Sequence, residues 1–439
     1  MFLPNCLDKF GNNNLNVLIF PAGTGVSKEI FDSLKYIRWI TLFGIDFDEN
    51  NFSYYQFENI EFGAPFIKDT ELTISYLKRI IAEKKIDCIF PAFDSVIVFL
   101  KTYEHELGVK IISSPIETCN ICFSKKKTYE YLKDIINVPK ILDANSIREF
   151  PVFIKPECGY GSRDSFKITN SEELAFYNKT IKNNIICEYL PGDEFTVDCF
   201  TSKTHGLIFC QARVRSKTVN GLSVLTKHVD LPDAKRIGEI ISSKLNFIGV
   251  WFFQLKYDYY GKLSLLEVAP RIPGAACLHR NKGINFPLLS IYEHYDNSID
   301  SVIVNDYNIS CYKCVENRFK LSIDYDYVYI DLDDTIIIKN KVNTKIMQYL
   351  YYTKNSNKKN ILITRNKTPI EKLKQYNICA ELFDHIIQVP SNHNKSEYIN
   401  NTNSVFIDDS HNERVDVYNR KNICVFNCDM IESLMDEKL

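Results

Sequence analysis

Three short apolar runs in the last part of the chain each end in a side chain suited to phosphoryl chemistry. YVYID ends at Asp331, with Asp333 two residues on; NILIT ends at Thr364; SVFIDD ends at Asp408 and Asp409. Runs of this length and composition are typical of buried strands, and the segments between them are long enough for helices. Three strands that each end in a suitable side chain are hard to obtain by chance. The pattern predicts alternating strands and helices with an active site at the strand ends.

These side chains could divide a phosphoryl-transfer reaction between them. One of Asp331 and Asp333 could attack phosphorus, while the other protonates the leaving group and then activates water. The hydroxyl of Thr364 could bind a phosphoryl oxygen. Lys395, which opens a predicted helix in HNKSEYI, could neutralise the phosphorylated aspartate. The paired carboxylates after the third strand would complete an oxygen cage for Mg²⁺.

The ordered set DxDxT, Thr, Lys and DD resembles the haloacid dehalogenase (HAD) superfamily over residues 323–439. The resemblance implies an Mg²⁺-dependent phosphatase with Asp331 as nucleophile and Asp333 as acid/base. It also implies metal ligation by Asp331, Asp333 through its backbone carbonyl, Asp408 and Asp409. Only 33 residues separate Asp331 from Thr364, which leaves no room for a large cap. We expect an open site, which favours a large substrate or one presented by another domain. The expected phosphoester is a phosphorylated small molecule or sugar.

Length and charge limit what the whole chain can do. A chain of 439 residues exceeds one compact core, so two or three domains are expected. With 53 basic and 55 acidic residues, no global field would recruit nucleic acid or an anionic membrane. No run approaches the roughly 18 apolar residues of a membrane span, and the N-terminus does not read as a secretory signal. We expect no nucleic-acid partner, no membrane insertion and small-molecule substrates.

The fourteen cysteines form no array with zinc spacing, and several lie inside strand-like apolar runs. Reduced thiols in a cytoplasmic protein are therefore expected.

The first 115 residues alternate apolar runs with helix-like segments. NVLIF, WITLFGID, CIFPAF and KIISS are typical of strands, and LTISYLKRIIAEKK is typical of a helix. This repetition predicts a parallel sheet covered by helices. PAGTG after the first strand can place backbone amides where an anion binds, but a tight turn explains these glycines about as well.

A lysine-bearing strand in the middle of the chain is suited to a triphosphate. PVFIKPECGYGSRDSFKI delivers Lys155 and then a flexible loop with Gly159, Gly161 and Ser162. The ammonium can meet phosphate oxygens while glycine amides close over them. Lys125 lies upstream, on the helix-like SKKKTYEYLKD. Taken alone, a surface hairpin with an incidental lysine explains this segment equally simply.

Two further segments carry oxygen ligands and a cation. IICEYLPGDEFTVDCF places Glu188 and Glu194 around a turn, where one can accept from an adenine amino group and the other from ribose hydroxyls. Taken alone, a hairpin with solvated acids explains it too. WFFQLKYDYYGKLSLLEVAPRIPGA predicts a hairpin with Gln254 and Glu267 on one face, as metal ligands require. Arg271 follows as a clamp for phosphate or carboxylate.

In this order the segments resemble the ATP-grasp superfamily over residues 15–300, in particular its carbamoyl-phosphate-synthase-like carboxylate–amine ligases. The resemblance implies ATP and Mg²⁺ as cofactors, an acyl-phosphate, an amide product, and carboxylate and amine substrates. It places Lys125 and Lys155 at the phosphates, Glu188 at adenine, Glu194 at ribose, Gln254 and Glu267 at Mg²⁺, and Arg271 at the phosphoryl group or substrate carboxylate. Arg213 and Arg215 resemble arginines that line the acceptor side, although an exposed basic strand edge would look the same.

The expected fold is thus an α/β and α+β multidomain chain. It comprises a pre-ATP-grasp α/β domain (1–115), an ATP-grasp domain (116–310, lid about 150–200), a linker (311–322) and a Rossmann-like HAD domain without a large cap (323–439).

One departure keeps two alternatives open. The superfamily usually carries an asparagine where this chain has Ala269, and often a glutamate at Gln254. This weakens the second metal position. The first alternative is an ATP-dependent kinase acting on a non-carboxylate acceptor. The second is a nucleotide-sensing module that regulates the phosphatase.

Overall fold

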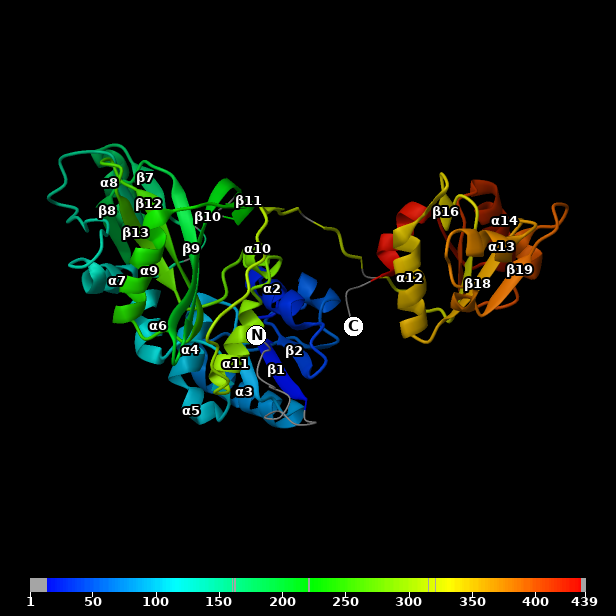
Figure 1. Cartoon of the computed structure of the whole chain (residues 1–439), viewed down its shortest axis with the longest axis horizontal. Coiled ribbons are helices and arrows are strands. Elements are labelled where there is room, and N and C mark those ends of the chain that lie inside the picture. The colour runs from blue at the N-terminus through cyan, green and yellow to red at the C-terminus, as the bar shows by residue number, and fades with distance from the viewer. Residues whose placement is uncertain are drawn as a thin grey trace. The chain divides into compact units, whose positions relative to one another are not determined.

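The computed structural model describes residues 14–159, 161, 163–219, 222–314, 316–319 and 321–435. The chain divides into two compact units at residues 315 and 316. We call the described residues 14–314 the N-terminal unit and the described residues 316–435 the C-terminal unit (Figure 1).

The N-terminal unit begins with a five-stranded parallel sheet of order β3-β2-β1-β4-β5. Val17 and Ile19 of the central strand join one apolar cluster, while Leu18 and Phe20 join another. All four side chains are buried, as expected for a strand covered by helices on both faces. The elements are β1 (Leu15–Phe20), α2 (Gly25–Leu34), β2 (Ile40–Ile45), η1 (Phe52–Tyr55), β3 (Asn59–Glu61), α3 (Thr70–Lys84), β4 (Cys88–Pro91), α4 (Asp94–Thr102), α5 (Glu104–Leu107) and β5 (Lys110–Ile111).

A six-stranded antiparallel sheet of order β13-β12-β9-β10-β11-β14 forms the centre of the same unit. One face packs against α9, where Ile237 and Ile241 contact a cluster that includes Trp251 and Phe253. The apolar side of this amphipathic helix therefore covers one face of the sheet. The elements are β9 (Glu194–Ser202), β10 (Gly206–Val219), β11 (Leu222–His228), α9 (Pro232–Lys244), β12 (Gly249–Tyr257), β13 (Leu263–Ala269), α10 (Cys277–Arg280), α11 (Phe286–His294) and β14 (Ser310–Tyr312).

A separate three-stranded antiparallel sheet of order β7-β6-β8 carries the lysine-bearing hairpin. It ends at Glu188, so the start of β9, which the sequence grouped with the lid, lies in the larger sheet. The reason is backbone pairing, since β9 bonds to both β10 and β12. The elements here are α6 (Ile116–Phe123), α7 (Lys125–Leu132), β6 (Val152–Pro156), β7 (Phe166–Ile168), α8 (Ser171–Thr180) and β8 (Asn184–Glu188).

The segment expected to be a linker, 311–322, starts as part of a sheet. β14 pairs antiparallel with β11, with Tyr312 opposite Leu225. An otherwise open sheet edge gains hydrogen bonds in this way, which apolar patterning alone does not reveal.

The C-terminal unit is a five-stranded parallel sheet of order β19-β18-β15-β20-β21. β15 is central, and the ends of β18 and β20 lie beside its own. Between β15 and β18 the chain forms only the short β16–β17 hairpin and α12, consistent with the expected lack of a large cap. The elements are β15 (Tyr327–Ile330), β16 (Ile337–Ile338), β17 (Lys341–Val342), α12 (Thr344–Asn355), β18 (Lys359–Thr364), α13 (Pro369–Gln375), η2 (Ala380–Leu382), β19 (His385–Gln388), η3 (Lys395–Tyr398), β20 (Ser404–Ile407), α14 (His411–Lys421), β21 (Cys424–Phe426) and η4 (Cys428–Leu434).

Within the described ranges, no helix combines the length and the apolar character needed to cross a bilayer. The cysteines that the structure describes are all free thiols.

Candidate functional site

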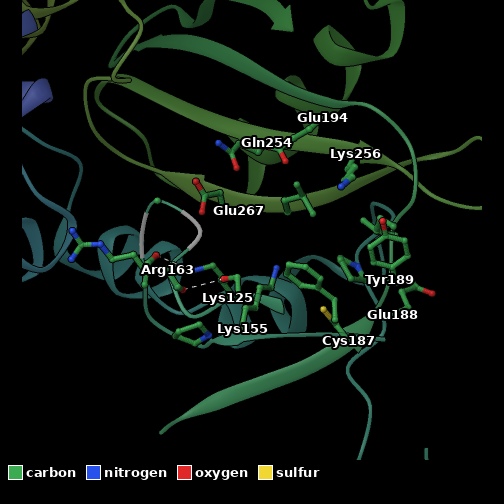
Figure 2. A pocket seen from close by; sticks show the side chains of 18 residues that line it. Lys125, Lys155, Arg163, Cys187, Glu188, Tyr189, Glu194, Gln254, Lys256 and Glu267 are labelled. Carbon is green, nitrogen blue, oxygen red and sulfur yellow. Dashed lines mark hydrogen bonds between the residues drawn. The ribbon is translucent and has the colours of Figure 1, made fainter. Parts of the chain in front are cut away.

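A first pocket lies between the three-stranded sheet and the six-stranded sheet. Lysines from the small sheet and α7 face acidic and amide side chains from β9, β12 and β13 (Figure 2). It brings together most of the residues that the sequence assigned to ATP. Those in its lining are Lys125, Lys155, Gly159, Gly161, Glu188, Glu194, Gln254 and Glu267. Ser162 lies outside the described residues.

The two lysines are held in different ways. Lys155 Nζ donates to Tyr129 Oη at 2.7 Å, and that hydroxyl donates to the carbonyl of Leu266 at 2.7 Å. Lys125 Nζ donates to the carbonyl of Gly159 at 3.0 Å. Burial lowers the pKa of the Lys125 ammonium, while the nearby Glu267 opposes the change. Both cations are therefore fixed by neutral oxygens, which an anionic ligand can replace as partners.

Tyr129 was not found from the sequence. It lies four residues after Lys125, on the same helix α7, so the two side chains share a face. The tyrosine is buried, and burial raises the pKa of its phenol well above its usual value. It stays a neutral hydrogen-bonding partner for Lys155. The i, i+4 spacing was the available signal.

The turn between β8 and β9, which joins the two sheets, requires a glycine at position 192. A Cβ on Gly192 would lie 2.4 Å from Tyr257 Cβ, and the amide of Gly192 donates to the Tyr257 carbonyl at 3.0 Å. This close approach fixes the turn between Glu188 and Glu194. The Glu188 carboxylate accepts from the Lys140 amide at 3.2 Å and lies at the edge of the pocket (Figure 2). The turn thus positions β8 and β9 on either side of one cavity.

Gln254 and Glu267 lie directly opposite each other on β12 and β13, as the predicted hairpin requires. Their oxygens form a donor pair of the kind that Mg²⁺ accepts, because directly paired side chains lie on one face and close together. Ala269 is buried opposite Phe252 and offers no ligand. Glu267 is therefore the one carboxylate among the positions of this hairpin where a metal ligand was considered.

A second pocket, with a cavity of about 330 Å³, opens beside the first. The two share Gly161, Gln254 and Glu267. Its other walls come from the starts of α2 and α4 and from the loop after β13, with Arg213, Arg215 and Arg271 also in the lining. A group bound in one pocket would meet a group bound in the other at the paired donors of β12 and β13.

Each arginine of the second pocket has a carboxylate partner. Arg271 binds Asp94 of α4 through Nε at 2.7 Å and Nη2 at 3.1 Å. Arg215 Nη1 lies 2.6 Å from Glu194, the residue assigned to ribose. This pair connects the acidic edge of the first pocket with the basic wall of the second.

Arg213 belongs to a buried charge cluster. Its Nε donates to Asp198 at 2.6 Å, and His279 Nε2 lies 2.9 Å from the same carboxylate. The exposed fractions of Asp198 and His279 are 0% and that of Arg213 is 4%. Burial opposes ionisation of Asp198, but Arg213 and His279 outweigh it and lower its pKa to about 2. The sequence offered no signal for Asp198 or His279 as partners of this arginine.

The C-terminal unit gathers the predicted phosphatase residues at the ends of adjacent strands. Lys395 Nζ lies 2.6 Å from both Asp331 and Asp408. Among the described residues, the carboxylates of Asp331, Asp408 and Asp409 form an acidic group that lies close enough together to hold a metal ion. Burial raises the pKa of Asp331 to about 7, with Lys395 opposing the rise and Asp408 adding to it. The pKa rises because burial and a neighbouring carboxylate both disfavour the charged form of Asp331.

The Asp333 carboxylate is not a member of that acidic group. Its carboxylate accepts from Asn366 Nδ2 at 2.9 Å and pairs with Lys372 of α13. Thr364 is buried at the end of β18, where its hydroxyl accepts from the Asn366 amide at 3.1 Å. Asn366 and Lys372 were not found from the sequence. The two motif aspartates therefore diverge into separate surroundings.

The comparisons with known proteins concern the N-terminal unit. Residues 180–312 match a family model described as ATP-grasp in the biosynthetic pathway with Ter operon. An L-amino acid ligase from Bacillus licheniformis superposes with a TM-score of 0.54 at 18% identity, over 66% of this chain and 76% of that one. This part of the N-terminal unit therefore has an ATP-grasp-like fold.

Two curated relatives of the chain are D-alanine–D-alanine ligases. That of Fusobacterium nucleatum is 30% identical over 178 residues, 37% of this chain and 61% of the relative. That of Thermotoga petrophila is 26% identical over 137 residues, 28% of this chain and 44% of the relative. The chain thus spans about half the length of the curated relatives it matches.

Proposed function

We propose that the N-terminal unit is an ATP- and Mg²⁺-dependent ligase that joins a carboxylic acid to an amine. We further propose that the C-terminal unit is an Mg²⁺-dependent phosphatase. The observation that carries the ligase is the junction of the two pockets at Gln254 and Glu267. A nucleotide in the first pocket and an acid in the second would meet there, beside oxygen donors suited to Mg²⁺.

The chain's own groups fit these ligands. Lys125 and Lys155 would exchange their neutral oxygen partners for phosphate oxygens. Glu194 would accept from ribose hydroxyls, and Arg271 would face the group that receives the phosphoryl. ATP would supply the phosphoryl group that activates the acid, so that an amine can displace phosphate and form an amide. The arginine pairs keep the receiving wall fixed before the substrates bind.

Relatives support the substrate classes. Two are D-alanine–D-alanine ligases, and one protein of the same fold is an L-amino acid ligase. Those names describe reactions between a carboxylate and an amine. We therefore propose small carboxylic acids and amines, amino acids among them, as the substrates here.

Replacing Glu267 with Gln should lower acid- and amine-dependent ADP release on the order of 100-fold. The reason is that the one carboxylate of the metal-directed hairpin is lost, and metal stabilisation of transition-state charge amounts to several kcal/mol. The measurement is phosphorus NMR of the full-length protein with MgATP and a defined mixture of amino acids, organic acids and sugar acids. An Asp331→Asn background keeps the proposed phosphatase from removing products.

Glu172→Gln is the matched control, because Glu172 is exposed on α8 and absent from both pocket linings; it should leave ADP release unchanged. ADP formation that needs an acid but no amine would instead establish a kinase. Nucleotide binding without turnover under any mixture would replace the ligase with the sensing module.

The phosphatase proposal stands on the grouping at the carboxyl ends of β15, β18 and β20. Asp331 would attack phosphorus, and Lys395 would offset the charge on the phosphorylated side chain. Asp333 would give a proton to the leaving group and then take one from water. Asp331, the Asp333 carbonyl, Asp408 and Asp409 would hold Mg²⁺. A phosphorylated small molecule or sugar is the proposed substrate class, which the short β16–β17 hairpin leaves room to enter.

A further inference from the structure

A lysine just before the C-terminal unit reaches the second pocket. β14 adds to the edge of β11, and the ladder continues when the Lys313 amide donates to the Val224 carbonyl at 2.9 Å. The side chain of Lys313 then donates to the carbonyl of Gly274, in the loop that lines the pocket. Cys311, two residues earlier, contacts Cys277 at the end of this loop, with 3.5 Å between the sulfurs. The strand therefore holds Lys313 against the pocket wall.

Lys313 differs from the other cations of the pocket in its partner. The guanidinium groups of Arg213, Arg215 and Arg271 lie 2.6–2.7 Å from carboxylates. Among the residues that the structure describes, Lys313 has a neutral carbonyl as its hydrogen-bond partner and no carboxylate within ion-pair distance. An arginine would have to leave its own carboxylate to bind a new anion fully. Lys313 can exchange a carbonyl for a carboxylate, and bonds between charged groups are the stronger ones.

We infer that Lys313 binds the carboxylate of the acid substrate in the second pocket. This inference rests on the proposed ligase function and adds a specificity residue to it. The match to the family model ends at residue 312, so Lys313 lies just past the matched segment. The residue is supplied by the strand that leads out of the N-terminal unit.

The test compares Lys313→Met with Lys227→Met in the full-length protein. Lys227 is exposed on the neighbouring strand, opposite Ser310, and is absent from the pocket lining. With MgATP and a mixture of D-alanine, the common L-amino acids and simple organic acids, Lys313→Met should raise the acid concentration for half-maximal ADP release about tenfold or more. The KM for ATP should stay within about twofold, and Lys227→Met should match the wild type. Lys313→Arg should recover most of the loss, since it restores the charge.

A second measurement does not depend on turnover. Acetylation of lysines by acetic anhydride, followed by peptide mass spectrometry, compares Lys313 with Lys227 with and without the same mixture. Protection of Lys313 alone supports the inference, even if the protein releases no ADP and the ligase proposal fails. Equal labelling of both lysines, or an unchanged acid requirement in an active Lys313→Met variant, overturns it. Protection by inorganic phosphate but by no carboxylic acid would also overturn it, because the pocket would then select phosphate.

Discussion

Replacing Asp331 with Asn is expected to lower hydrolysis of p-nitrophenyl phosphate by the full-length protein at least about 10⁴-fold, because the attacking oxygen is lost. The substitution changes little in shape. An amide oxygen is a poor nucleophile and cannot form the aspartyl-phosphate. Lys395 would keep Asp408 as its partner at 2.6 Å, so the unit should remain folded. The measurement is release of p-nitrophenol with and without Mg²⁺.

The control is Asp324→Asn. Asp324 is exposed, a few residues before β15, and its replacement should leave the rate within about twofold of wild type. The ADP release proposed for the N-terminal unit should be the same in both variants. If Asp331→Asn retained most of the Mg²⁺-dependent hydrolysis, the proposed nucleophile would be wrong. If the wild type hydrolysed no phosphoester from a panel of sugar and small-molecule phosphates, the phosphatase proposal itself would be refuted.

Site residues that lie at the end of a strand were predictable from the sequence. Asp331, Thr364 and Asp408 each lie at or just after the end of an apolar run, and parallel pairing of β18, β15 and β20 brings those ends together. Gln254 and Glu267 were predictable for a related reason, since a short turn sets which residues of a hairpin lie opposite each other.

The partners of these residues were not predictable, because they come from tertiary packing. Asp94 reaches Arg271 across 177 positions of the chain, and Lys372 reaches Asp333 across 39. No periodicity or motif in either segment specifies such a pair. Arg213 was assigned to the substrate because it resembles arginines that line the acceptor side in the ATP-grasp superfamily, but its Nε donates to the buried Asp198. The sequence showed that Arg213 is a cation, but it could not show that Asp198 already neutralises that charge.

Replacing Asp198 with Ala is expected to destabilise the N-terminal unit by about 3–5 kcal/mol. The substitution leaves Arg213 as an uncompensated buried charge and removes the carboxylate that lies beside His279. Tryptophan fluorescence, excited selectively over tyrosine, measures this during urea unfolding of the whole protein. Both tryptophans, Trp39 and Trp251, lie in the N-terminal unit, so the signal reports that unit alone. As a control, Asp233→Ala removes an exposed pair with Arg236 and should cost less than about 1 kcal/mol.

Two further experiments distinguish the effect of losing the Asp198 charge from the effect of the cavity that the substitution leaves. The triple variant Asp198→Leu, Arg213→Met and His279→Leu removes all three members of the buried cluster. It should recover most of the lost stability, since apolar residues of similar volume need no compensation. The pKa of Asp198 is lowered from 3.8 to about 2, so its contribution is complete above about pH 5 and is lost as the pH falls through about 2. The difference in unfolding free energy between wild type and Asp198→Ala should therefore shrink over that interval. A difference that stayed constant down to pH 2, with no recovery in the triple variant, would mean that the cavity and not the charge explains the loss.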